Sequence, residues 1–340
     1  MTETSHNLTL EEIGKLAGVS RSTVSRVING QRHVRADVRD RVEAVIAETG
    51  YLPNQAARAL VSNRTGLIGL VMPTDAEELF GDPYYSALVA GIQLGCADAR
   101  LIFSIFPVDG QRDEMTVLST LVAQGFVDGL IVTAGAGSDR LITALRDRGK
   151  NMVVVGHPAD DRGLRRVDVE NRAGSAAAVA HLVGLGRTRV GFVGPGASYL
   201  YGRERLEGYR DALVDAGRGL EDRLVRHAEP TVEGGFEAAH ALLAEDPDSV
   251  HVATDTMAVG VLRAIAERGL RVPDDVAVVG FDGFPGAPRT EPSLTTVVQP
   301  VVDVGRTAVH QLHRDQDLAE LVVLPTVLRI GATCGAIGGA

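Results

Sequence analysis

The 340 residues include 34 Lys or Arg and 44 Asp or Glu, which gives a formal net charge of −10. This length is too great for one ordinary core and favours a small module joined to a larger body of two lobes. Residues 1–64 hold 9 basic and 7 acidic residues, so they carry +2 while the remainder carries −12. A polyanionic partner is therefore expected at the N-terminus, and the acidic remainder is expected to be an ordinary soluble body.

The cysteine content and the hydropathy exclude other classes. Cys96 and Cys334 are too few and too far apart for a disulfide framework or a thiolate metal site, which fits a reducing compartment. No run approaches the roughly 18 apolar residues that span a bilayer, and the polar start "MTETSHN" is not typical of a signal peptide. We expect a cytoplasmic protein with no metal and no cofactor.

The first predicted helix follows Thr9, which can act as its N-cap with Glu12 as the reciprocal partner in a capping box. Apolar residues then recur at helical spacing: Leu10, Ile13, Leu16 and Ala17. Gly18 permits a tight turn, and Ser20 can cap a second helix.

The second predicted helix has two different faces. Its buried stripe is apolar, with Val24, Val27 and Ile28. Its other face carries hydrogen-bond donors, namely Arg21, Ser22, Ser25 and Arg26. A third helix is expected over residues 36–49 and ends at Gly50. Three short helices with a donor-rich second helix predict a helix-turn-helix whose second helix could lie in a DNA major groove.

The stretches "AGVSRSTVSRVING" and "RVEAVIAETGYLPNQAARAL" resemble the DNA-binding head of the LacI/GalR family of bacterial transcription regulators. The resemblance implies that Arg21 and Ser22 read bases, with Arg26 one turn further on. It implies further DNA contacts, mainly to the backbone or groove edges, at Thr9, Ser20, Thr23, Ser25, Asn29, His33, Tyr51 and Asn54.

The segment "PNQAARALVSN" differs from the helices before it. Pro53 can start a helix and the alanines favour one, but about seven residues are too few for a helix that is stable alone. The resemblance implies a hinge helix that orders in the minor groove and wedges Leu60 between central base pairs, with Arg58 nearby. Such a wedge unstacks bases, a cost recovered because the bent DNA contacts more protein.

After Arg64 the pattern changes to short buried strands separated by helical stretches such as 84–98, 115–124 and 173–185. The strand runs are "GLIGLVM", "RLIFSIF", "DGLIVT", "NMVVVG", "RVGFVG", "SVHVAT" and "VAVVGF". This alternation predicts parallel, doubly wound α/β sheets in two lobes. The resemblance implies the two-lobed fold of periplasmic sugar-binding proteins, whose lobes close on a ligand.

The expected domains are a helix-turn-helix head at 1–52, a hinge helix and linker at 53–64, and an effector-binding and dimerisation body at 65–340. Within the body, the first lobe is expected at about 65–165 and 295–318. The second is expected at about 166–294 and 319–335. The glycine-rich end "RIGATCGAIGGA" lacks a leucine repeat, which favours a homodimer over a coiled-coil tetramer.

The effector is expected at the strand ends, where α/β proteins bind ligands. The resemblance implies ligand contacts at Tyr84, Tyr85, Tyr199, Tyr201, Arg205, Thr254, Asp255 and Asp282. Two departures argue against a monosaccharide: Thr254 and Gly156 stand where the family's simple-sugar repressors often carry Asn and Asp. The tyrosines favour an oligosaccharide or glycoside, because their rings can stack on a sugar face.

The function expected from these features is a repressor that a small carbohydrate releases from a palindromic operator. A corepressor-dependent regulator with a non-sugar effector uses the same parts and stays open. A sugar-binding protein or carbohydrate-active enzyme is a weaker alternative, because no nucleophile elbow, P-loop or paired zinc-ligand motif is present in the sequence. We therefore expect a regulator and not an enzyme.

Overall fold

A computed structural model describes residues 8–28, 34–51, 64–73, 81–108, 116, 119, 126–135, 137–284, 290–313 and 319–335. The chain divides into two compact units, 1–65 and 66–340, which we call the head and the body. Across the described residues, no helix combines the length and the apolar character needed to cross a membrane.

The head contains α1 (Leu10–Ala17), α2 (Arg21–Ile28) and α3 (Ala36–Thr49), as the sequence predicts. The expected capping box is confirmed: the Thr9 hydroxyl accepts from the Glu12 amide at 3.3 Å, and the Glu12 carboxylate accepts from the Thr9 amide at 2.7 Å. Ile13, Val24 and Val42 form the fully buried centre of the head.

One expectation for α1 is wrong. Leu16 does not join the apolar stripe but is 60% exposed. The buried residues of α1 are Ile13, Gly14 and Ala17, so the face that meets the other two helices is narrow. Three short helices offer too little buried area to cover a wider one.

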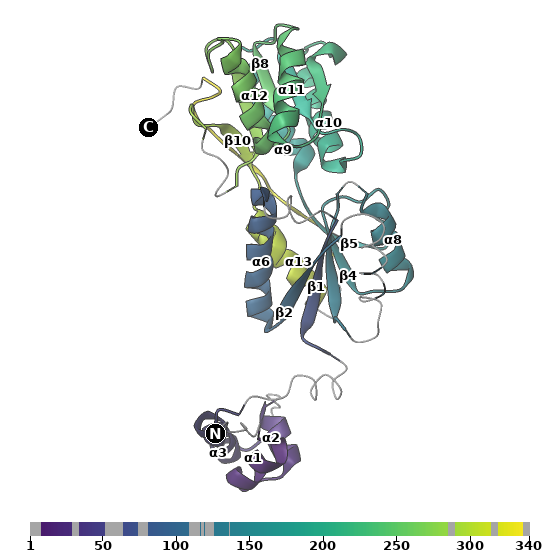
Figure 1. The fold of residues 1–340 in the computed structure, drawn as a ribbon, viewed down its shortest axis with the longest axis vertical. Helices are drawn as coiled ribbons and strands as arrows, with labels where there is room; N and C mark the ends of the chain where they lie inside the picture. Colours follow the sequence, from purple (N-terminus) through teal and green to yellow (C-terminus); the bar gives the residue numbers. More distant parts are fainter. Residues whose placement is uncertain are drawn as a thin grey trace, which may run out of the picture. The chain divides into compact units, whose positions relative to one another are not determined.

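The first lobe of the body is a parallel sheet of six strands in the order β11-β5-β4-β3-β1-β2. Its strands are β1 (Leu67–Met72), β2 (Ile102–Pro107), β3 (Gly129–Thr133), β4 (Met152–Val155), β5 (Arg165–Val169) and β11 (Leu321–Leu324). Helices α6 (Pro83–Ala99) and α13 (Val301–His313) lie side by side on one face, and α8 (Asp139–Asp147) lies on the other (Figure 1).

The second lobe repeats this plan with the strand order β12-β10-β9-β8-β6-β7, in which only the β10–β12 pair is antiparallel. Its strands are β6 (Val190–Gly194), β7 (Val225–His227), β8 (Ser249–Val252), β9 (Ala277–Asp282), β10 (Thr295–Val298) and β12 (Val327–Arg329). Its helices are α9 (Asn171–Gly184), α10 (Leu200–Asp215), α11 (Val232–Leu243) and α12 (Asp255–Glu267), with a short 3₁₀ turn at Asp222–Leu224.

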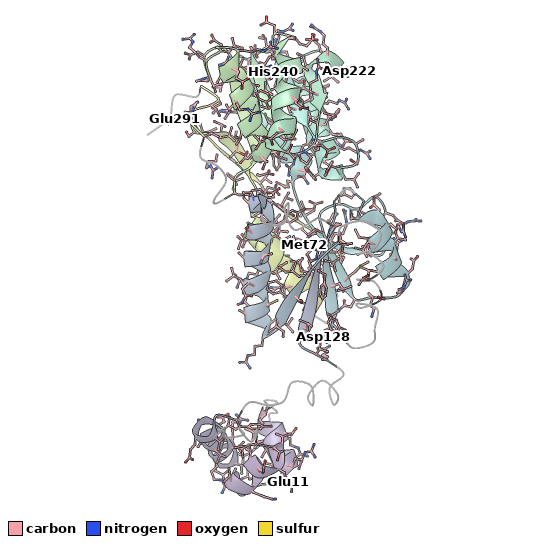
Figure 2. The ribbon with its side chains drawn as sticks, in the orientation of Figure 1. Glu11, Met72, Asp128, Asp222, His240 and Glu291 are labelled. Atoms are coloured by element: carbon pink, nitrogen blue, oxygen red, sulfur yellow. The ribbon has the colours of Figure 1, made fainter. Side chains whose placement is uncertain are left out.

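The strands of the first lobe point their carboxyl ends at the second lobe. Met72 ends β1 and Asp128 precedes β3, and the two residues lie at opposite ends of the sheet, with Met72 nearer the second lobe (Figure 2). Ligands of α/β proteins bind beyond such carboxyl ends. The fold therefore creates a ligand site between the lobes.

The lobe boundaries differ from the sequence expectation. Strands β5 and β11, expected in the second lobe, pair with each other in the first sheet, and β10, expected in the first lobe, pairs with β9 in the second. The described chain consequently passes between the lobes after β5, after β10 and after β11. The expectation failed because an apolar run predicts a strand but not the sheet that it joins. The helix expected at 115–124 lies largely outside the described residues.

Pairs of helices in both lobes cross at glycines. A Cβ atom added to Gly91 of α6 would lie 2.0 Å from the Val302 carbonyl oxygen of α13, and one added to Gly260 of α12 would lie 1.9 Å from the Val232 oxygen of α11. These distances are far below van der Waals contact, and the clashing atoms belong to the backbone. The helices can approach this closely only because the side chains are absent.

The Gly91→Ala variant is therefore expected to lower the free energy of unfolding of the body by about 1–3 kcal/mol, as overpacking does. Gly184→Ala is the matched control, because nothing lies within 4 Å of a Cβ at that helical position. It should be neutral or stabilising by up to about 1 kcal/mol. Urea unfolding of both variants measures the difference, and equal stabilities would contradict the close crossing.

Candidate functional site

The exposed face of α2 carries the donors that the sequence predicts. Arg21, Ser22 and Arg26 are exposed, whereas Val24 and Val27 of the same helix are buried in the head. Ser20 caps the helix, since its hydroxyl accepts from the Thr23 amide at 3.3 Å. The Ser20 oxygen also lies 2.8 Å from Ser22 Oγ and 2.9 Å from Thr23 Oγ1, so three hydroxyls cluster at the N-terminus of the helix.

The other residues with expected DNA contacts differ in how exposed their side chains are. Ser25 is half-buried on α2, and the Thr9 hydroxyl is engaged in the capping box of α1. Tyr51 is 8% exposed and packs into the core of the head, so much of its ring is unavailable to DNA. The remaining expected contacts lie outside the described residues: Asn29, His33, Asn54, Arg58 and Leu60.

The body holds a cavity of about 580 Å³ that both lobes line. Seven of the eight expected effector contacts lie on its walls: Tyr84, Tyr85, Tyr199, Tyr201, Arg205, Thr254 and Asp282. Pro83 and the Asp82 cap start α6, which places Tyr84 and Tyr85 in its first turn. Tyr199 and Tyr201 stand at the start of α10, one turn before Arg205.

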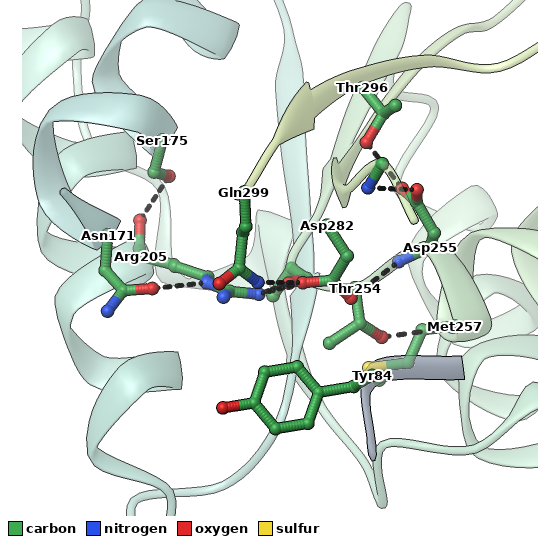
Figure 3. Close-up of polar contacts among 12 residues, drawn as sticks. Tyr84, Asn171, Ser175, Arg205, Thr254, Asp255, Met257, Asp282, Thr296 and Gln299 are labelled. Atoms are coloured by element: carbon green, nitrogen blue, oxygen red, sulfur yellow. Dashed lines mark hydrogen bonds and ion pairs between the residues drawn. The ribbon is translucent and has the colours of Figure 1, made fainter. Parts of the chain in front are cut away.

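Arg205 and Asp282 form the polar centre of this wall (Figure 3). The guanidinium NH1 group donates to Asp282 Oδ1 at 3.0 Å and to the Ala253 carbonyl, and Nε donates to Asn171 Oδ1 at 3.0 Å. Both side chains of the ion pair are buried, and the Arg205 Cζ atom lies 3.7 Å from the centre of the Phe281 ring. A buried ion pair contributes little net stability, because desolvation offsets the attraction. Stability alone therefore does not account for it.

Asp282 is held on several sides. Gln299 Nε2 donates to its Oδ1 at 2.6 Å, and the Gln299 amide donates to its backbone oxygen at 2.9 Å. Its φ of 127° is a conformation that few residues other than glycine adopt. Burial raises the pKa of the Asp282 carboxyl, and the neighbouring Arg205 charge opposes that shift. Such a constrained carboxylate is typical of a binding site.

Asp255 does not lie on the cavity wall, in contrast to the expectation. Its carboxylate accepts from the Gly283 amide at 2.8 Å and from the Thr296 hydroxyl at 2.6 Å. These bonds connect the residue that follows β9 to strand β10. Its neighbour Thr254 lines the cavity and caps α12, since its hydroxyl accepts from the Met257 amide at 3.1 Å.

Several wall residues were missed by sequence reasoning. Asn171 and Gln299 lie at two of the crossings between lobes, and Asp168 is the penultimate residue of β5. A polar residue just after a buried strand, as in "VDVEN" and "TTVVQ", is the signal that could have found them.

A hydrogen-bonded cluster joins the two lobes at one side of the cavity. His157 Nδ1, after β4, lies 2.7 Å from Glu204 Oε1 of α10. Asn171 Nδ2 donates to Glu204 Oε2 at 3.0 Å and to Asp168 Oδ1 at 3.3 Å. One ring nitrogen of His157 and one carboxylate oxygen each of Asp168 and Glu204 lie within 4.8 Å of one another. These hydrogen bonds connect the three side chains into one network across the lobes.

Aromatic rings cover the rest of the wall. The Tyr84 ring meets those of Tyr85 and Phe284 at centroid distances of 5.4 and 5.7 Å, and Tyr199 meets Tyr201 edge-on at 5.7 Å. Burial raises the pKa of the Tyr84 and Tyr201 hydroxyls far above the neutral range, so both remain protonated donors. A cavity of rings, carboxylates and one guanidinium suits a ligand that has both apolar faces and hydroxyl groups.

A helix-turn-helix head on a two-lobed body with a ligand cavity defines a ligand-responsive DNA-binding regulator. Residues 9–54 match the family model described as bacterial regulatory proteins, lacI family, and residues 179–334 match the periplasmic binding protein-like domain. The transcriptional regulator CelR of Thermobifida fusca is 36% identical over 302 residues, covering 88% of each chain. The chain belongs to the LacI family of bacterial transcriptional regulators, and its relatives are DNA-binding proteins and not enzymes.

Two solved structures resemble the whole chain. A CelR–cellobiose complex has a TM-score of 0.75 at 32% identity and covers 96% of this chain and 99% of its own. The lac repressor dimer bound to operator and the anti-inducer ONPF has a TM-score of 0.79 at 29% identity and covers 97% of this chain and 99% of its own.

Proposed function

We propose that this protein is a homodimeric repressor of a near-palindromic operator and that a small uncharged carbohydrate, such as an oligosaccharide or glycoside, releases it. The charge of the cavity carries the proposal. Among the described lining residues Arg205 is the single guanidinium, against five carboxylates: Asp82, Asp139, Asp168, Glu229 and Asp282. Because Asp282 already neutralises Arg205, a sugar phosphate or other anion is repelled. Hydroxyl groups can instead donate to the carboxylates.

The size and the rings of the cavity support the same class of ligand. A volume of about 580 Å³ lies inside the range of roughly 300–1,000 Å³ that small-molecule sites occupy. The tyrosine rings at both walls can stack on the apolar faces of sugar rings. The relative solved with cellobiose makes that disaccharide the first probe for this chain.

Release of DNA follows from differential binding. An effector that contacts both lobes stabilises the closed arrangement, and it can shift the equilibrium only by its difference in affinity for the two arrangements. We propose that lobe closure moves the hinge segments of the dimer, so that the minor-groove contacts expected from Leu60 are lost.

The test is thermal unfolding of the full-length protein with cellobiose, longer oligosaccharides, monosaccharides, a sugar phosphate and a purine. A ligand at 100 times its Kd is expected to add about 2.7 kcal/mol of stability. The same ligand should then release an operator selected by this protein from random DNA. Stabilisation by the sugar phosphate or the purine alone would contradict the uncharged-carbohydrate effector. Tighter DNA binding with ligand would indicate a corepressor.

A further inference from the structure

Asp168 stands out among the carboxylates of the cavity. It is the penultimate residue of β5 in the first lobe, is 8% exposed, and lines the cavity. Its Oδ1 accepts from the Val169 amide at 2.8 Å and from Asn171 at 3.3 Å. Within the part of the chain that the structure describes, no hydrogen bond reaches Oδ2. Because Asp168 lines the cavity, this second carboxylate oxygen is available to accept a hydrogen bond from a ligand.

The surroundings of Asp168 favour an uncharged donor. Burial is the largest influence on the pKa of Asp168; the Val169 amide lowers this pKa, Glu204 of α10 raises it, and Arg166 and His157 lower it. Burial outweighs these effects and raises the pKa of Asp168 to about 6, so the carboxylate is ionised at neutral pH. An anionic ligand group would add to the repulsion from Glu204, but a hydroxyl can donate without a charge penalty.

The position of Asp168 also connects it to the opposite wall. Arg205 and Asp282 belong to the second lobe, and Asn171, at the crossing between lobes, bonds to both Asp168 and Arg205. A ligand that reaches Asp168 and the Arg205–Asp282 pair therefore touches both lobes at once. Contacts of this kind are the ones that distinguish a closed cleft from an open one.

We propose that Asp168 is the specificity-determining residue of the first lobe, whose Oδ2 accepts a hydrogen bond from an effector hydroxyl and so links effector binding to lobe closure. The proposal rests on the proposed function, because it requires an uncharged, hydroxyl-bearing effector in this cavity.

The test is calorimetric titration of the full-length Asp168→Asn variant with the sugar of the thermal panel that stabilises the wild type most. The amide keeps the size and one acceptor but loses the charge, so the Kd is expected to rise about tenfold or more. Glu170→Gln is the matched control, because it removes a carboxylate two residues away that is exposed and does not line the cavity. It should change Kd by less than about twofold, and both variants should bind operator DNA like the wild type.

A pH profile separates recognition from a merely structural role. If the ionised carboxylate accepts the hydroxyl, wild-type affinity falls as the pH is lowered through about 6, by up to about tenfold for each pH unit below it. This component should vanish in Asp168→Asn and persist in Glu170→Gln. An unchanged Kd and profile in Asp168→Asn would overturn the inference and leave the proposed function intact.

Two further outcomes are decisive. If no panel sugar binds the wild type, the proposed function and this inference both fail. If Asp168→Asn does not bind operator DNA, Asp168→Glu replaces it, since this variant keeps the charge but moves it by one methylene. That variant should bind the sugar more weakly while retaining the pH dependence, and wild-type affinity in it would overturn the inference.

Discussion

The Asp282→Ala variant is expected to lose effector binding and about 3–5 kcal/mol of the free energy of unfolding of the body. The loss is large because Arg205, itself 3% exposed, is left as a buried charge without its carboxylate. Gln299 loses its acceptor in the same variant. Calorimetric titration with the effector and urea unfolding of the variant measure the two losses.

An exposed ion pair of the body supplies the control. Asp98 lies 2.8 Å from Arg306, but both side chains are more than two-fifths exposed. Asp98→Ala should cost at most about 1 kcal/mol and leave effector affinity unchanged. Removing both buried charges in an Arg205→Met/Asp282→Asn variant should restore part of the stability without restoring binding. Full effector affinity in Asp282→Ala would move the effector site away from this cavity.

The Arg21→Ala variant is expected to lose about 1–3 kcal/mol of operator binding, and the loss should be confined to particular base pairs. Arg21 begins α2 and is exposed, so its guanidinium is free to form the bidentate contacts with guanine that discriminate between bases. Binding to a set of singly substituted operators, measured at one fixed salt concentration, gives the loss at each position.

Arg41→Ala tests whether that loss is more than missing charge. Arg41 is exposed on α3, outside the donor-rich face, and its removal changes the net charge of the head equally. Its effect should be small and the same on every DNA sequence. A uniform loss in Arg21→Ala as well would mean that Arg21 contacts phosphate and does not read bases.

Local signals in the sequence were enough for the elements of the head, whereas the expected cavity residues came mainly from the family resemblance. The Thr9–Glu12 capping box, the Gly50 terminator with φ of 64° and the apolar stripe of α2 act within one or two turns of chain, so they can be recognised from neighbouring residues. Arg205 and Asp282 were expected in the cavity from the resemblance and from their places near strand ends.

The tertiary structure decided everything that depends on which distant segments meet. The apolar runs of β5, β10 and β11 predict strands but not the sheet that each strand joins. That depends on pairing with segments that can be distant in the chain, such as Leu321 with Arg166. The carboxylate of Asp255 accepts a hydrogen bond from Thr296 of β10, a distant residue that sequence reasoning did not identify as its partner. Asp168 and Asn171 line the cavity because the chain crosses between the lobes next to them, after β5. Periodicity and caps are properties of adjacent residues, whereas sheet order and side-chain partners are set by packing between segments that are remote in sequence.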